Sequence, residues 1–109
     1  MIHGEARGES YEGKLAVGAV VMNRVKSPLF PNTIKEVIYQ PRAFTCVDDG
    51  QINLEPDEES YRAAFDALLG IDPTDGCLFY YNPKTATSRW MRQRRSIHVV
   101  SIGNHVFMK

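Results

Sequence analysis

One glutamate lies in a segment that suits acid catalysis. Glu5 belongs to the run His3-Gly4-Glu5-Ala6-Arg7-Gly8-Glu9, with glycines on both sides. Glycine lets a backbone or a bulky ligand approach closely. A strongly apolar stretch follows, so we expect Glu5 at a partly apolar cleft wall, where burial disfavours its charged form. A carboxyl that holds its proton there can protonate a glycosidic oxygen. By itself the pattern is weak, because most glutamates near a helix start are caps or solvated charges.

Aromatic and amide side chains favour a sugar-binding surface. Tyrosine and tryptophan combine a flat face with a polar tip, which suits a sugar ring, and carboxamides can bond to acetamido groups. The residues predicted on this basis to bind substrate are Phe44, Gln51, Tyr80, Tyr81, Asn82, Trp90 and His105, with Phe79 and Asn53 as further candidates. A core role remains equally open for Phe44, Phe79 and Trp90, since large aromatics are usually mostly buried. For His105 a structural role competes with a place in the cleft, which we favour.

Other chemistries find little support. The histidines show no ligand spacing such as HExxH, so we predict neither a metal nor another cofactor. The chain has no GxSxG nucleophile motif and no phosphate-binding glycine loop. Cys46 and Cys77 can form one disulfide or remain two small buried residues, and we favour the second state.

Charge excludes some classes of partner. Thirteen basic and thirteen acidic residues give a net charge of zero, which argues against a chain-wide electrostatic grip on nucleic acid. Acidic residues gather between positions 48 and 59, and we interpret them as a solvated face. The later cluster of Arg89, Arg92, Arg94 and Arg95 suits a solvated face or an anionic polymer equally well. No apolar run approaches the roughly 18 residues of a membrane-spanning helix.

The helices that must position Glu5 are predicted from hydrophobic spacing. Residues 11–26 are apolar nearly all round, which indicates an interior helix, and Gly18 fits a close helix crossing. We expect a short helix at 33–39 and an irregular segment at 42–54. Residues 57–69 give the clearest amphipathic helix, with Pro56 at its first position. The stripe of that helix expected to pack inward is Tyr61, Ala64, Phe65, Leu68 and Leu69.

Strands are expected in the last third of the chain. The aromatic run at 77–81 and the segments 97–101 and 104–108 favour short strands, with a turn near Gly103 and Asn104. Helices followed by short strands in 109 residues predict one α+β domain.

Several separate segments resemble one family. The opening IHGEARGESYEGKLAVGAVVMNRV, the central PNTIKEVIYQPRAFTCVDDGQINLEP and the closing GCLFYYNPKTATSRW and IGNHVFMK resemble the spore cortex-lytic, SleB/CwlJ-type cell wall hydrolases. The resemblance covers essentially the whole chain. It implies a lysozyme-like fold related to lytic transglycosylases, with helices around a buried central helix and a small antiparallel sheet.

The resemblance also implies a substrate and a site. The implied substrate is the N-acetylmuramic acid–N-acetylglucosamine backbone of peptidoglycan, usually in spore cortex, and the implied location is extracytoplasmic. Glu5 corresponds to the catalytic acid/base. Other positions that recur in the family are Gly4, Phe44, Asn82, Trp90, Gly103 and His105. Since a helix normally leads into this glutamate, we expect residues 1–109 to be a single catalytic domain shortened at its N-terminus.

Three functions remain open at this stage. A lytic transglycosylase that forms 1,6-anhydromuramic ends is favoured, because it needs only one carboxylate. A muramidase usually needs a second carboxylate, and no independent signal selects one among Glu9, Asp48 and Asp49. A non-catalytic glycan-binding module would need no acid at all. We expect a monomer that acts on peptidoglycan strands, with any regulatory partner unidentified. A Glu5 side chain in open solvent, remote from any groove and from the tyrosines, would contradict the enzymatic interpretation.

Overall fold

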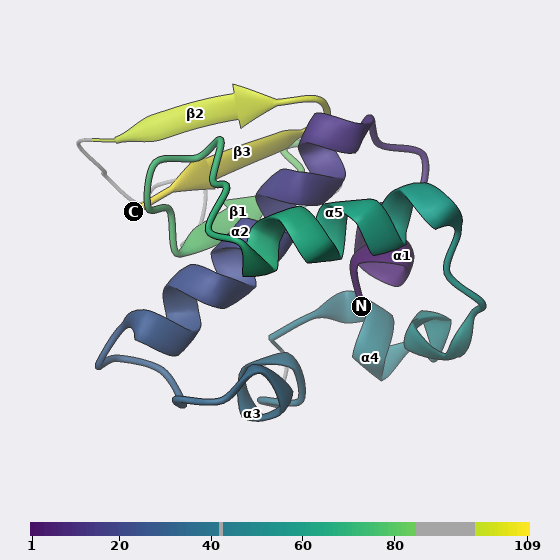
Figure 1. Ribbon diagram of the computed structural model, residues 1–109, viewed down its shortest axis with the longest axis horizontal. Helices are drawn as coiled ribbons and strands as arrows, with labels where there is room; N and C mark the ends of the chain where they lie inside the picture. The colour runs from purple at the N-terminus through teal and green to yellow at the C-terminus, as the bar shows by residue number, and fades with distance from the viewer. Residues whose placement is uncertain (42, 85–97) are drawn as a thin grey trace.

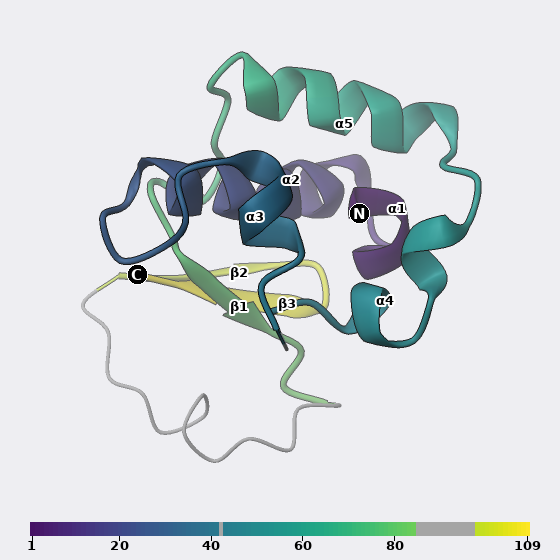
Figure 2. The same ribbon diagram turned by 90° about the horizontal axis from the view of Figure 1, so that it is seen from below.

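A central helix, α2 (Tyr11–Lys26), runs between another helix and a small sheet in the computed structural model (Figures 1 and 2). The structure describes residues 1–41, 43–84 and 98–109. Helix α5 (Glu58–Leu68) covers one side of α2. The strands β1 (Phe79–Tyr81), β2 (Val99–Ile102) and β3 (His105–Met108) lie on the other side, as Figure 2 shows. The α+β class predicted from the sequence is confirmed.

The remaining helices are short. Helix α1 (Ile2–Glu5) packs against α4 (Thr45–Asp48) and against the 3₁₀ helix η1 (Gln51–Asn53). Helix α3 (Ile34–Ile38) begins after its cap Thr33, close to the predicted bounds. The prediction of an irregular segment at 42–54 was wrong, because α4 and η1 lie there. These single turns gain their stability from packing on α1, and such short helices leave no periodic signal in the sequence.

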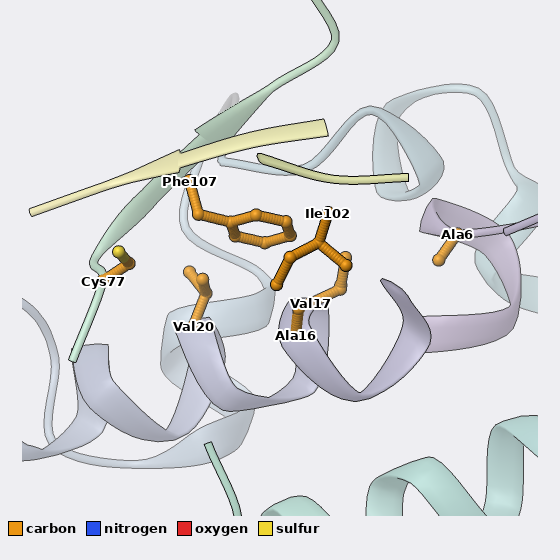
Figure 3. Packing of buried hydrophobic residues seen from close by; sticks show 7 residues of the cluster. All are labelled: Ala6, Ala16, Val17, Val20, Cys77, Ile102 and Phe107. Carbon is orange, nitrogen blue, oxygen red and sulfur yellow. The ribbon is translucent and has the colours of Figure 1, made fainter. Parts of the chain in front are cut away.

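The sequence accounts well for α2. The Ser10 side chain caps its N-terminus by accepting a hydrogen bond from the Gly13 N–H at 3.3 Å. The interior location is confirmed, since every residue from Gly13 to Val21 is buried. Ala16, Val17 and Val20 point from α2 toward Phe107 and Ile102 of the sheet (Figure 3), and these residues form one core cluster with Ala6 and Cys77.

Gly18 marks the closest approach of three helices. A Cβ atom at this position would lie 2.9 Å from Ile2 Cδ1 and 3.1 Å from Ala67 Cβ. The close crossing expected at Gly18 is therefore confirmed, with α1 and α5 as the neighbours.

The hydrophobic pattern predicted helix α5 at nearly the right position but assigned the wrong face of it to the core. Its buried residues are Ser60, Ala63 and Ala67. Most of the stripe expected to pack inward is exposed instead, namely Tyr61 (59%), Phe65 (63%), Leu68 (59%) and Leu69 (65%), whereas Ala64 is half-buried. The physical reason is the short distance to α2 at Gly18, which admits alanines and excludes bulky side chains. Pro56 also lies outside the helix, because Asp57 is the N-cap and accepts from the Ser60 N–H at 2.8 Å.

The strands of the described residues form one antiparallel sheet in the order β1-β3-β2, so β3 is central. Phe107 pairs with Tyr80 on one side and with Val100 on the other. The predicted strands are confirmed within two residues, and Gly103, at φ 59°, makes the turn between β2 and β3. Cys46 and Cys77 are both free and buried, as favoured above. Within the described ranges no helix is long and apolar enough to span a membrane.

Candidate active site

Glu5 is the last residue of α1, and a glycine sets the position of that helix. A Cβ atom on Gly4 would lie 2.9 Å from Cys46 Cβ and 3.0 Å from the backbone oxygen of Gln51. Only a residue without a side chain allows α1 to approach α4 and η1 this closely. Gly4 therefore makes room for the neighbouring Cys46 and for the backbone of Gln51.

Two hydrogen bonds fix the Glu5 carboxyl group. The Tyr80 hydroxyl donates to Glu5 Oε1 at 2.5 Å, and the Cys46 backbone N–H donates to Oε2 at 3.2 Å. A carboxylate has about four lone-pair positions, so about two remain for a proton and a ligand. Glu5 is half-buried and lies against a tyrosine, which is the opposite of the open-solvent position that would have contradicted the enzymatic interpretation.

Tyr80 connects Glu5 to the sheet. Burial, followed by the adjacent Glu5 charge, raises the pKa of Tyr80 well above its usual value near 10. The hydroxyl therefore stays a hydrogen-bond donor at neutral pH. Its ring stacks 6.4 Å from that of Phe44, and it meets Phe107 at 5.5 Å and His105 edge-on at 5.1 Å between ring centres. This packing fixes the direction in which the hydroxyl points.

Phe44 and Arg24 support the site from behind. Phe44 is only 2% exposed, so its ring has no free face for a sugar, and the substrate contact predicted for it gives way to a packing role. The Arg24 guanidinium lies 4.9 Å from the ring centre of Phe30 and 5.1 Å from that of Phe44. Its Nε donates to the Leu78 carbonyl at 2.7 Å. Burial lowers the pKa of Arg24, an effect that the nearby Tyr80 and Glu5 oppose. The sequence signal for Arg24 was a cation in line with Val17, Val20 and Val21 of the apolar helix α2.

A second carboxylate, that of Glu9, contacts His105, whose ring lies against Tyr80. The Glu9 side chain is only 7% exposed, and its Oε1 lies 3.2 Å from His105 Nδ1. The Asn104 backbone N–H points at both Glu9 oxygens, at 3.3 and 3.4 Å. His105 is thereby placed beside Tyr80, with its own side chain 11% exposed.

The remaining predicted residues are less closely connected to Glu5. Gln51 is half-buried, and both its N–H and its side-chain amide donate to Asp49. Tyr81 and Asn82 are half-buried at the end of β1. Asn53 is exposed. Trp90 and the four clustered arginines lie outside the described residues.

An apolar groove of about 260 Å³ lies on another part of the molecule. It is lined mainly by α1, α2, α3 and α5, and Glu5 is not among its lining residues. Within the part of the chain that the structure describes, no group of three or more His, Cys, Asp or Glu side chains is placed to hold a metal ion.

Comparisons with known proteins agree on one family. The profile of the family described as Cell Wall Hydrolase matches residues 8–108. The spore cortex-lytic enzyme of Oceanobacillus iheyensis is 53% identical over 108 residues, which cover 99% of this chain and 38% of that protein. The chain thus spans about two fifths of the length of this curated relative.

Two solved structures have the same fold. The catalytic domain of the Bacillus cereus SleB protein superimposes with a TM-score of 0.87, at 53% identity, over 99% of this chain and 83% of that one. The catalytic domain of the germination-specific lytic transglycosylase SleB from Bacillus anthracis gives a TM-score of 0.90, also at 53% identity, over 99% and 87% of the two chains.

Proposed function

The chain belongs to the cell wall hydrolase family, and from that membership we propose that it is a lytic transglycosylase that cleaves the glycan strands of peptidoglycan. Its substrate is spore cortex, in line with the names of its relatives. It acts outside the cytoplasm as the catalytic domain of a longer protein. Its helices around α2 and its small antiparallel sheet support a lysozyme-like domain.

The observation that carries this proposal is the anchored Glu5 carboxyl group. Tyr80 and Cys46 each donate to one of its oxygens, and the side chain is half-buried. This leaves the group oriented and still partly exposed. A glycosidase acid must be both, because it has to reach a bridging oxygen with a defined geometry.

In the first step, Glu5 gives its proton to the oxygen that links muramoyl C1 to the next N-acetylglucosamine, and the C1–O bond breaks. The leaving sugar departs with the transferred proton. Donors fixed in advance stabilise the charge that develops on the acid, and the Tyr80 hydroxyl and the Cys46 N–H lie where they can do so.

In the second step, the 6-hydroxyl oxygen of the same muramoyl residue bonds to C1, and its proton goes to the Glu5 carboxylate. The acid is regenerated, no water is consumed, and the product ends in a 1,6-anhydro ring. Gln51, Tyr81, Asn82 and Trp90 are the proposed contacts to the sugars, with His105 at the edge of the site.

The position of Glu9 removes one of the three carboxylates that could have assisted hydrolysis by a muramidase. A second catalytic carboxylate must face the substrate or its attacking water. Glu9 is 7% exposed and directed at His105 and the Asn104 N–H. Such a carboxylate has little access to a water on the sugar.

The proposal is tested by digesting purified spore cortex and identifying the products by mass spectrometry. The wild-type protein should release muropeptides with anhydromuramic ends. Glu5→Gln should lower the rate by about 10²- to 10⁴-fold, while the exposed matched control Glu12→Gln should not.

Other outcomes separate the alternatives. Reducing ends that incorporate ¹⁸O from labelled water would indicate a muramidase. Binding of cortex without cleavage would indicate a glycan-binding module. A Glu5→Gln protein that cleaves at the wild-type rate would exclude Glu5 as the acid.

A further inference from the structure

The buried carboxylate of Glu9 occupies a place that the β2–β3 turn leaves open for it. Glu9 follows a turn closed by its own N–H, which donates to the Ala6 carbonyl at 3.1 Å. From there its side chain reaches the Asn104 N–H, across 95 residues of sequence. Glu9 thus connects the segment just after Glu5 to the hairpin near the other end of the chain.

Gly103 indicates how closely the two segments fit. It has a left-handed backbone, at φ 59°, and a Cβ atom at this position would collide with the Glu9 carboxylate. The turn therefore needs glycine for its conformation, and the Glu9 carboxylate lies directly against it. The Asn104 N–H, which donates to this carboxylate at 3.3 and 3.4 Å, links it to the hairpin.

The next contact leads back toward the acid. Glu9 Oε1 lies 3.2 Å from His105 Nδ1, a distance at which the two form an ion pair when His105 is protonated, although within the described residues Nδ1 has no hydrogen-bond partner. The His105 ring meets the Tyr80 ring edge-on at 5.1 Å, and it also contacts Phe107 at 6.1 Å between ring centres. Tyr80 in turn donates to Glu5. A continuous series of contacts therefore joins the two glutamates through His105 and Tyr80.

A buried charge at this point requires a reason other than stability. Removing a carboxylate from water is costly, and an apolar side chain of similar size would usually fill the same space at least as stably. Glu9 also lacks the exposure that direct contact with the substrate would need. Its contacts are with the hairpin and with the ring beside Tyr80.

We propose that Glu9 is a positioning residue, which fixes the His105 ring so that Tyr80 keeps its hydroxyl on Glu5. This role rests on the proposed function, because it assigns Glu9 to the geometry of the acid in that reaction. Loss of the Glu9 charge should leave substrate binding intact and lower the turnover of bound substrate.

The test compares Glu9→Gln with Glu12→Gln, the same chemical change at an exposed position three residues further along. Kinetics on soluble cortex fragments should show kcat reduced about 10- to 100-fold in the Glu9 variant, with KM within twofold, because small misplacements of a catalytic group cost rates of this order. A loss confined to KM would overturn the positioning role.

A spectroscopic measurement makes the test independent of activity. The ¹³C resonance of Tyr80 Cζ reports the hydrogen bond that its hydroxyl donates. It should move toward the value of a solvated tyrosine in Glu9→Gln and stay unchanged in Glu12→Gln. If it stays unchanged in both, the link from Glu9 to Tyr80 is refuted. An inactive wild-type protein would refute the proposed function, and the resonance would still decide the link.

A second variant covers the case in which Glu9→Gln does not fold. His105→Phe keeps a ring against Tyr80 and Phe107 but removes the nitrogen that faces Glu9. The proposal expects the same displacement of the Tyr80 resonance and the same fall in kcat. A His105→Phe protein with wild-type values for both would overturn it.

Discussion

Removal of the Tyr80 hydroxyl should slow the reaction without dismantling the site. Tyr80→Phe keeps the ring that packs on Phe44, His105 and Phe107. It removes the donor 2.5 Å from Glu5 Oε1. The carboxylate that forms when Glu5 releases its proton would then lose one of its two fixed donors.

The magnitude is set by the value of a hydrogen bond to a charged group. Such a bond contributes about 1.5–3 kcal/mol, and about 1.4 kcal/mol corresponds to a tenfold change in rate. Glu5 is half-buried, so water can replace part of the lost bond. We therefore expect the lower part of the range, a fall in kcat of about 10- to 30-fold.

The assay measures kcat and KM on soluble cortex fragments, together with the thermal unfolding of each variant. Tyr39→Phe is the matched control, because Tyr39 lies at the end of α3 and is 56% exposed. A Tyr80→Phe protein with kcat within twofold of the wild type would refute the view that this hydroxyl supports the acid.

Two further predictions concern Cys46 and the two faces of helix α5. Burial and the adjacent Glu5 raise the pKa of the Cys46 thiol to about 12, so at pH 8 only about one thiol in ten thousand is ionised. Iodoacetamide should therefore label Cys46 far more slowly in the native protein than in urea, as followed by peptide mass spectrometry; equal rates would contradict the burial. Phe65→Lys should change the free energy of unfolding by less than about 0.5 kcal/mol, whereas Ala67→Lys should cost several kcal/mol. If urea denaturation shows that Phe65→Lys is the more destabilising variant, the inward face predicted from the sequence would be the correct one.

Elements with a long apolar signal were predictable. Helix α2 is buried along most of its length, and its sequence has no polar face that another location would need. Helix α5 was predicted with nearly correct bounds, but its inward face was wrong. The pattern assigns the largest apolar side chains to the core, whereas the contact of Ala67 with Gly18 selects the smallest ones.

The candidate site was predictable as a set of residues, but its geometry was not. Glu5 and Tyr80 were both selected from the sequence, on separate grounds. Their hydrogen bond joins positions 75 residues apart, and no spacing rule encodes such a pair. Helix α1 was missed because a four-residue helix has no periodicity and depends on its tertiary contacts.

Glu9 shows the same limit from another side. The sequence alone did not distinguish Glu9 from Asp48 and Asp49 as a candidate second carboxylate. Only its burial and its contact with the β2–β3 turn separate it from Asp49, which is exposed.

The separation of Glu5 and Tyr80 along the chain also affects when the protein can become active. A ribosome makes the segment of Glu5 before that of Tyr80, and Tyr80 is held by β3, which ends at Met108. An unfinished chain carries the acid without the strand that orients its donor. The oriented carboxyl group can therefore form only after β3 has been synthesised and has paired with β1.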